Sequence, residues 1–210
     1  MKRILCFGDS NTWGHNPADG SKLKGCWPDV LEELLPECDI VRDGVCGRST
    51  EFDVPDMPNS NGMEVFRKKY LNGRNEFDMI IIMLGTNDLL KYFNSGAAET
   101  ARALKGFVTE FKSVFSDADT EILLVSPVHI SRSVLKHPIF KELYGENAVR
   151  ESERFAQYIS QTAKETGAYF LDAAEYASAS DMDGVHMDAE DHEKLAKAVA
   201  SEIKLILFRE

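Results

Sequence analysis

The sequence predicts an α/β fold of three layers, in which a five-stranded parallel sheet lies between two layers of helices. Short apolar segments of strand length alternate along the chain with longer segments in which apolar residues recur every three to four positions. Some strand segments are hydrophobic throughout, which is typical of parallel strands buried on both faces. The strands also end in small polar loops, and such loops lie together at one edge of an open parallel sheet.

Two of the five strands are marked most clearly. The segment 79–84 is apolar throughout and ends in a Gly-Thr-Asn-Asp loop. The segment 4–7 stops abruptly at Gly-Asp-Ser, where turn-forming residues begin. Three further strands are predicted over 38–41, 121–125 and 169–172.

Helices are predicted between these strands from apolar periodicity and from residues typical of helix ends. Pro28 lies in the first turn of a helix over 27–35, where its missing N–H costs little. Asp188 can cap the last helix, which runs to about residue 208. Further helices are predicted over 63–71, 98–115 and 147–166. The segment 126–145 is long for a connection, which indicates a functional loop.

Length and composition limit the number of domains and the partners that the chain is expected to have. The chain has 210 residues without a repeat or linker, so residues 1–210 are predicted to form a single domain. A net charge of −11 repels polyanions, which makes nucleic acid an unfavourable partner. No long apolar segment or secretory leader is evident, so we expect a cytoplasmic protein without a membrane partner. The four cysteines match neither a redox pair nor a zinc motif and are expected to be reduced.

A nucleophile, a base and a carboxylate can meet at the edge where the strands end. Ser10 follows the first strand, and its hydroxyl can attack a substrate only if a base reaches it. In the last loop, Asp183 and His186 are close enough for the carboxylate to hold one imidazole nitrogen. The other nitrogen can then take a proton from Ser10. The alternative for each feature alone is an ordinary turn or a solvated loop.

Donors for a developing oxyanion follow the same edge. The amides of Ser10 and Gly47 and the side-chain amide of Asn87 are suitable groups for acyl transfer. His15, Trp13 and Trp27 are candidates for the cavity mouth, and Trp27 fits the core equally well. His129, after the fourth strand, also points to this edge.

The chain resembles the SGNH (GDSL-type) hydrolase family in four sequence blocks. They are Phe7-Gly8-Asp9-Ser10, Gly44-Val45-Cys46-Gly47, Gly85-Thr86-Asn87-Asp88 and Asp183-Gly184-Val185-His186. The blocks occur in the order and spacing of that family and span the whole chain. The Thr-Trp-Gly sequence after Asn11 is similar to the arylesterase and acyltransferase branch. Asn11 itself stands where the GDSL signature has leucine, a change that affects the pocket lip.

The resemblance implies a flavodoxin-like fold and cleavage of small acyl esters, with acyl transfer as a further activity. It implies Ser10 as the nucleophile, His186 as base and acid, and Asp183 as the residue that orients His186. Ser10, Gly47 and Asn87 would form the oxyanion hole, and neither a metal nor another cofactor is implied. Asp9, Asn11, Trp13 and His129 are candidates for substrate binding. The partner would be a small-molecule ester, and a homo-oligomer is left open.

Two other functions remain open from the residues. A doubly wound sheet with a polar first loop could bind phosphate or a nucleotide as a flavodoxin-like module without hydrolase activity. The acidic residues around the same edge oppose this hypothesis. A metal-dependent phosphoesterase could use Asp9, Asp183 and His186, with Asp188 as a further candidate, although their spacing fits no metal motif.

Overall fold

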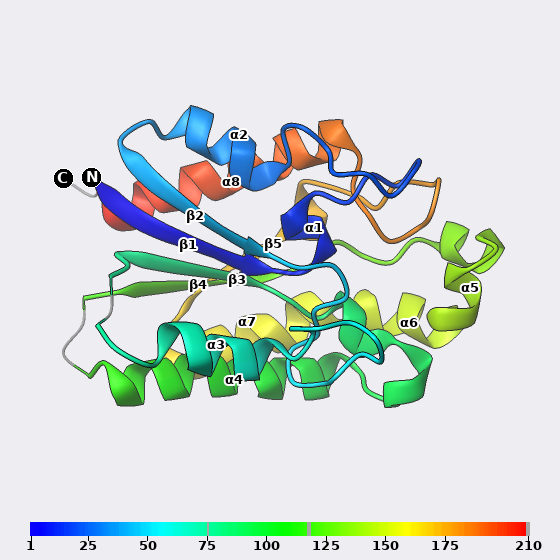
Figure 1. Cartoon of the computed structure of the whole chain (residues 1–210), viewed down its shortest axis with the longest axis horizontal. Coiled ribbons are helices and arrows are strands. Elements are labelled where there is room, and N and C mark those ends of the chain that lie inside the picture. Colours follow the sequence, from blue (N-terminus) through cyan, green and yellow to red (C-terminus); the bar gives the residue numbers. More distant parts are fainter. Residues whose placement is uncertain (75, 117–118, 209–210) are drawn as a thin grey trace.

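The computed structural model describes residues 1–74, 76–116 and 119–208 and contains a parallel sheet of five strands (Figure 1). The strands are β1 (Lys2–Gly8), β2 (Cys38–Gly44), β3 (Met79–Met83), β4 (Glu121–Ser126) and β5 (Tyr169–Asp172). Their order is β2-β1-β3-β4-β5, and every neighbouring pair is parallel. The predicted α/β fold with a five-stranded parallel sheet is therefore confirmed.

The strand order reverses between β1 and β3. The chain passes from β1 to β2 on one side and then returns to β3 on the other side of β1. The loops that follow β1 and β3 therefore diverge at their carboxyl ends. Open α/β sheets bind ligands at such a point. Ser10 follows β1 and Asn87 follows β3, so both lie beside it.

Helices cover both faces of the sheet (Figure 1). One face carries α2 (Trp27–Leu34) and α8 (Ala189–Leu207), and the other carries α3 (Gly62–Tyr70), α4 (Ala97–Val114) and α7 (Phe155–Thr166). Alternate residues of β3 enter the two cores, with Ile81 facing α2 and α8 and Ile80 facing the other helices. All five residues of β3 are buried, which explains why its sequence is apolar throughout. Within the described residues, no helix has the length and apolar character needed to cross a membrane.

The prediction of a single helix over 147–166 is wrong, because the chain forms two helices there. These are α6 (Gly145–Ser152) and α7, separated by Glu153 and Arg154. The buried Ser152 hydroxyl donates to the Val149 carbonyl over 2.8 Å and accepts from the Ile130 amide over 2.9 Å. This contact with the segment after β4 fixes the break. Apolar periodicity continues on both sides of it and does not reveal it.

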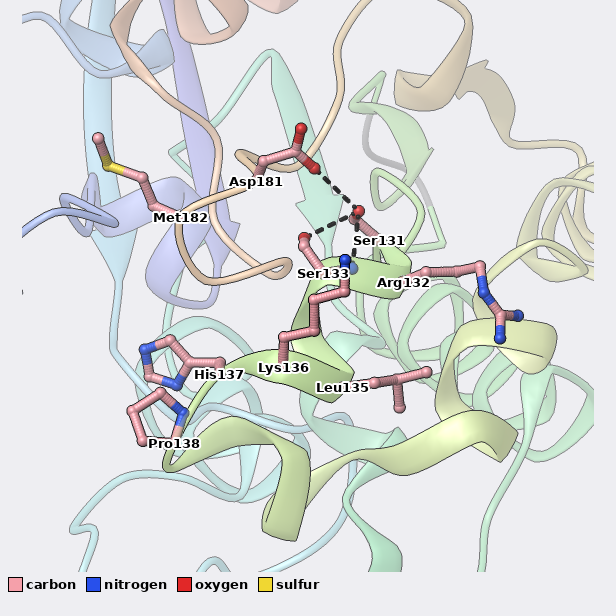
Figure 2. A pocket seen from close by; sticks show the side chains of 9 residues that line it. All are labelled: Ser131, Arg132, Ser133, Leu135, Lys136, His137, Pro138, Asp181 and Met182. Carbon is pink, nitrogen blue, oxygen red and sulfur yellow. Dashed lines mark hydrogen bonds between the residues drawn. The ribbon is translucent and has the colours of Figure 1, made fainter.

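Short helices occur where the sequence predicts loops. They are α1 (Ser10–Trp13), η1 (Thr86–Leu89), η2 (Lys91–Phe93), η3 (Arg132–Lys136), α5 (Phe140–Leu143) and η4 (Ala173–Glu175). Helix η3 borders a cavity of about 720 Å³ that Asp181 and Met182 close from the other side (Figure 2). The Ser131 hydroxyl joins the two sides through a 3.4 Å hydrogen bond to Asp181. None of the predicted catalytic residues lines this cavity.

Candidate active site

Ser10 is the first residue of the single-turn helix α1, directly after β1. Asp9 caps this helix, because its side chain accepts a hydrogen bond of 2.9 Å from the Asn11 amide. The cap fixes the turn that carries Ser10 out of the sheet. The Ser10 side chain lines a cavity together with His186 and Asn87.

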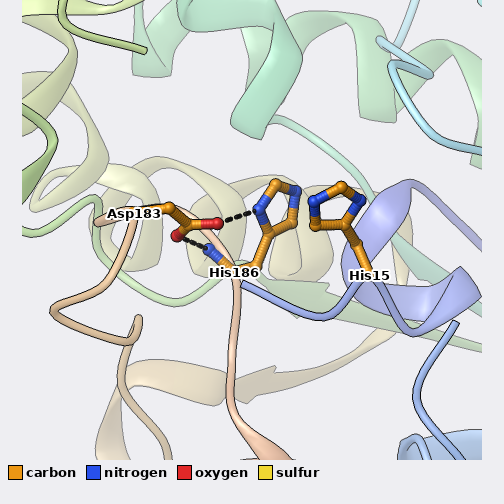
Figure 3. Close-up of side chains that lie close together, drawn as sticks. All are labelled: His15, Asp183 and His186. Atoms are coloured by element: carbon orange, nitrogen blue, oxygen red, sulfur yellow. Dashed lines mark hydrogen bonds and ion pairs between the residues drawn. The ribbon is translucent and has the colours of Figure 1, made fainter. Parts of the chain in front are cut away.

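Asp183, His186 and Ser10 form a continuous chain of hydrogen bonds. Nε2 of His186 lies 2.9 Å from Oγ of Ser10. Nδ1 of His186 lies 2.6 Å from Oδ2 of Asp183, as Figure 3 shows. The second oxygen of Asp183 accepts from the amides of Val185 over 2.8 Å and His186 over 2.9 Å. A carboxylate on Nδ1 favours the tautomer in which Nε2 is free to accept a proton.

The ionisation of Asp183 suits it to accept a hydrogen bond from Nδ1 of His186. Burial disfavours its charge, but the hydrogen bond from His186, the charge of that ring and two backbone amides together hold the pKa of Asp183 below its ordinary value. Asp183 is therefore ionised at neutral pH and remains an acceptor for His186. The loop that carries Asp183 needs a glycine at position 184. A Cβ there would lie 2.3 Å from the Val134 amide nitrogen, and Gly184 has a φ of 77°.

Gly47 and Asn87 line the same cavity as Ser10 and His186. Gly47 has a φ of 79°, and a Cβ at this position would lie 2.2 Å from the sulfur of Met57. Nδ2 of Asn87 donates to the Arg48 carbonyl over 3.0 Å, and Oδ1 accepts from the Tyr144 hydroxyl over 3.0 Å. These two bonds fix which end of the Asn87 amide is the donor, and Nδ2 keeps a second hydrogen.

Arg48 fixes the loop that carries Gly47. Its guanidinium is fully buried against the Phe7 ring and donates to the carbonyls of Gly8 and Asp43 and to the Asp43 carboxylate. The carboxyl ends of β1 and β2 are thereby joined beneath Gly47. The buried pairing with Asp43 satisfies a charge that would otherwise be costly in the core.

The cavity that contains Ser10 has a volume of about 370 Å³ and is mostly apolar. Its apolar and aromatic walls come from residues after β2, from η2 and from the region of α5. They are Val54, Pro55, Met57, Leu90, Tyr92, Phe140, Leu143 and Tyr144. No Asp, Glu, Lys or Arg lines it within the part of the chain that the structure describes. The cavity therefore suits an uncharged ligand.

Several residues predicted to bind substrate do not line this cavity. Asp9 caps α1, and the Asn11 side chain is buried against the backbone of the His186 loop. Trp13 borders a neighbouring hollow that it shares with Met57. His129 lies in a third cavity, beside Asp181. The expectation that Asn11 forms a pocket lip is wrong, because only 2% of this residue is exposed.

His15 lines the cavity that contains Ser10 and contacts the ring of His186. Its ring stacks on that of His186, with centroids 4.0 Å apart and an interplanar angle of 30° (Figure 3). His15, Asp183 and His186 offer possible metal ligands within 4.8 Å of one another. Lone pairs lie in the ring planes, however, so two stacked rings do not direct them at one ion. Trp27, the other candidate for the cavity mouth, is buried in the core.

Tyr144 and the cavity walls from residues 54–57 and 140–143 were not predicted from the sequence. The unusual length of the segment 126–145 is the one signal that points to Tyr144 and residues 140–143, and it gives no indication of residues 54–57. The specific contact of Tyr144 with Asn87 depends on how this segment folds back over the sheet edge.

A flavodoxin-like sheet with a Ser–His–Asp arrangement at its carboxyl edge is typical of hydrolases with a serine nucleophile. Residues 4–199 match the sequence profile of the family described as GDSL-like Lipase/Acylhydrolase. The chain belongs to this family and is a carboxylic ester hydrolase. Family membership therefore decides against a nucleotide-binding module without hydrolase activity. No curated protein matches the chain significantly.

Solved structures of esterases are similar over almost the entire chain. An aryl esterase of M. smegmatis is 28% identical, with a TM-score of 0.88 and coverage of 98% of this chain and 100% of that one. A carbohydrate acetylesterase family member from Sinorhizobium meliloti is 25% identical, with a TM-score of 0.90 and full coverage of both chains, 100%. A protein of Agrobacterium tumefaciens str. C58, provisionally named an arylesterase, is 32% identical with a TM-score of 0.87, covering 98% and 100%.

Proposed function

We propose that this chain hydrolyses small uncharged acyl esters through an acyl-enzyme on Ser10. His186 takes the proton of the Ser10 hydroxyl while Oγ attacks the acyl carbonyl carbon. The resulting tetrahedral intermediate collapses, the ester C–O bond breaks, and His186 gives its proton to the departing alcohol. Water then attacks the acyl-enzyme, again with His186 as base, and releases the acid and free Ser10.

Asp183 and three donors assist these steps. Asp183 holds His186 in the required tautomer and stabilises its protonated form. The amides of Ser10 and Gly47 and the side chain of Asn87 stabilise the oxyanion in both tetrahedral intermediates. The observation that carries the proposal is the hydrogen-bonded chain from Asp183 through His186 to Ser10, which opens on an apolar cavity.

The cavity favours apolar ester groups. The relatives named above are an aryl esterase and a carbohydrate acetylesterase. A sugar brings several hydroxyls, and each would lose a hydrogen bond to water in a cavity lined largely by Val, Leu, Met and aromatic side chains. Small aryl and alkyl esters are therefore the proposed substrates. A panel of acyl and alcohol groups tests this preference, and faster turnover of acetylated sugars than of aryl acetates would contradict it.

The same acyl-enzyme can transfer its acyl group to an alcohol. An alcohol with an apolar body can enter the apolar cavity and take the place of water, with His186 again as the base. The test is the ratio of new ester to free acid when a short-chain alcohol is added in water. A ratio no greater than the molar ratio of alcohol to water would refute selective transfer.

The decisive experiment on hydrolysis uses p-nitrophenyl acetate and the Ser10→Ala variant. We expect this variant to lose the esterase rate and its labelling by a fluorophosphonate, while retaining the fold by circular dichroism. Ser21→Ala is the matched control, because Ser21 is exposed and its hydroxyl bonds only to Asp19 and Asn16 among the described contacts. Full activity in Ser10→Ala would refute the mechanism.

A further inference from the structure

Asn11 joins the helix that carries the nucleophile to the loop that carries the base. Its Nδ2 donates to the Val185 carbonyl over 3.2 Å, and its Oδ1 accepts from the Met187 amide over 3.0 Å. Val185 and Met187 flank His186 on both sides. One side-chain amide therefore holds the backbone before and after the base.

This two-point contact is closed to solvent. Asn11 and Val185 are each 2% exposed, and Met187 is 0% exposed. Water cannot easily replace the amide, so without Asn11 a buried carbonyl and a buried N–H would both lose their partner. The loop would then have to move to satisfy them. A movement of this kind displaces His186 directly.

We propose that Asn11 is a positioning residue, which sets the distance between the base and the nucleophile by clamping the backbone around His186. The inference rests on the proposed function of Ser10 and His186. Asn11 directly follows Ser10, and its own amide is fixed by Asp9 over 2.9 Å. The nucleophile and the clamp therefore belong to one rigid turn, to which the His186 loop is attached.

The two hydrogen bonds of Asn11 hold the backbone on either side of His186, whereas other contacts hold its ring. Asp183 fixes the orientation of the imidazole ring, and the Ser10 hydroxyl contacts Nε2. The contact with Ser10 is lost when the serine becomes acylated, just when His186 must remain in place to activate water. Because the Asn11 bonds involve no reacting atom, they persist throughout the cycle. Asn11 thus keeps the base aligned in the step where the nucleophile no longer can.

The test compares Asn11→Leu, which keeps the side-chain size and removes both hydrogen bonds, with Asn11→Asp, which keeps the acceptor for Met187. We expect Asn11→Leu to lower kcat for p-nitrophenyl acetate by roughly 10- to 100-fold with little change in KM, since misplacement by about 1 Å costs this much. Asn11→Asp should lie between this variant and the wild type. Asn72→Leu makes the same change at an exposed asparagine at the end of α3 and should not alter kcat.

A double-variant comparison separates positioning of the base from a general disturbance of the site. In a His186→Ala background the remaining slow rate does not use the base, so adding Asn11→Leu should cause no further loss. Wild-type kcat in Asn11→Leu, or an equal further loss in the His186→Ala background, would overturn the proposal. If Asn11→Leu does not fold, Asn11→Asp decides by the same comparison. Full activity in His186→Ala or Ser10→Ala would instead refute the proposed function.

Discussion

The hydroxyl of Tyr144 donates a hydrogen bond to Oδ1 of Asn87 over 3.0 Å, and both residues line the cavity that contains Ser10. Burial raises the pKa of Tyr144, so the phenol keeps its proton and remains a donor. With Oδ1 occupied in this way, Nδ2 is the end of the Asn87 amide that is available to an oxyanion. Tyr144 thus sets the orientation of a proposed oxyanion donor.

Tyr144→Phe should therefore slow the chemical step. We expect kcat for p-nitrophenyl acetate to fall by about 3- to 30-fold, because removing one neutral hydrogen bond costs roughly 1 kcal/mol or somewhat more. KM should change little, since the ring remains in the cavity wall. Tyr176→Phe, at an exposed tyrosine, is the matched control. A large rise in KM with unchanged kcat would instead identify Tyr144 as a substrate contact.

Asn87→Ala should have a larger effect on the same step. Loss of one oxyanion donor typically costs about 10²–10³ in kcat. The variant also leaves the Tyr144 hydroxyl and the Arg48 carbonyl without their partner, so we expect a loss of unfolding free energy of about 1–3 kcal/mol. Steady-state kinetics and urea denaturation measure the two effects. Activity within about twofold of the wild type would remove Asn87 from the proposed oxyanion hole.

Asp88 is expected to make the fold less stable as the pH rises. It is fully buried beside Asn87, where it accepts hydrogen bonds from the amide and hydroxyl of Thr50. Burial raises its pKa to about 7. Because the pKa in the folded state lies above its value in the unfolded chain, the carboxyl stabilises the fold at low pH and this contribution is lost as the pH rises toward 7.

The Asp88→Asn variant tests this pH dependence. An asparagine cannot ionise, so the variant does not lose this contribution. Its unfolding free energy relative to that of the wild type should therefore rise between pH 5 and pH 8 by something on the order of 2 kcal/mol. Urea denaturation at the two pH values measures the difference. Asp53→Asn, at an exposed loop position, should show no such change. Parallel behaviour of Asp88→Asn and the wild type would contradict the expectation.

His192 is expected to make the fold less stable as the pH falls, which is the opposite of the effect of Asp88. It is fully buried on α8, and its Nδ1 accepts a hydrogen bond of 3.3 Å from the Trp27 amide, which requires the neutral ring. Burial lowers its pKa to about 4. As the pH falls, this histidine is therefore protonated in the unfolded chain before it is protonated in the folded one. The stabilisation that neutral His192 gives the fold is complete above about pH 6.5 and is lost as the pH falls toward 4.

His192→Gln tests this point, since an amide oxygen can accept the same hydrogen bond without titrating. Between pH 7 and pH 5 we expect the wild type to lose on the order of 2 kcal/mol more unfolding free energy than the variant. Denaturation curves at these pH values provide the measurement. An equal loss in both proteins would show that His192 does not contribute to acid sensitivity.

Local sequence patterns predict much of this fold, because each strand and the helices α2, α3, α4 and α8 are indicated by their own residues. The apolar run of β3 and the Pro28 helix are examples. The break between α6 and α7 could not be predicted, because it depends on the contact of Ser152 with Ile130. The meeting of Ser10, Asp183 and His186 was predictable, since parallel topology gathers strand ends at one edge.

The role of Asn11 shows where such reasoning stops. Its position next to Ser10 suggests a place at the pocket lip, but its side chain is directed at Val185, which is 174 positions away in the sequence. Nothing local indicates that direction. The cavity walls from residues 54–57 and 140–144 are likewise products of tertiary packing.

The central claim, that Ser10 carries the acyl group, is tested most directly by trapping the covalent intermediate. The enzyme is mixed with p-nitrophenyl acetate, quenched in acid during the first turnovers, digested and mapped by mass spectrometry. We expect an acetyl group on the peptide that contains Ser10, at the Ser10 hydroxyl, and none on this peptide in the Ser10→Ala variant. Turnover with an unmodified Ser10 and an acetyl group on another residue would contradict the account.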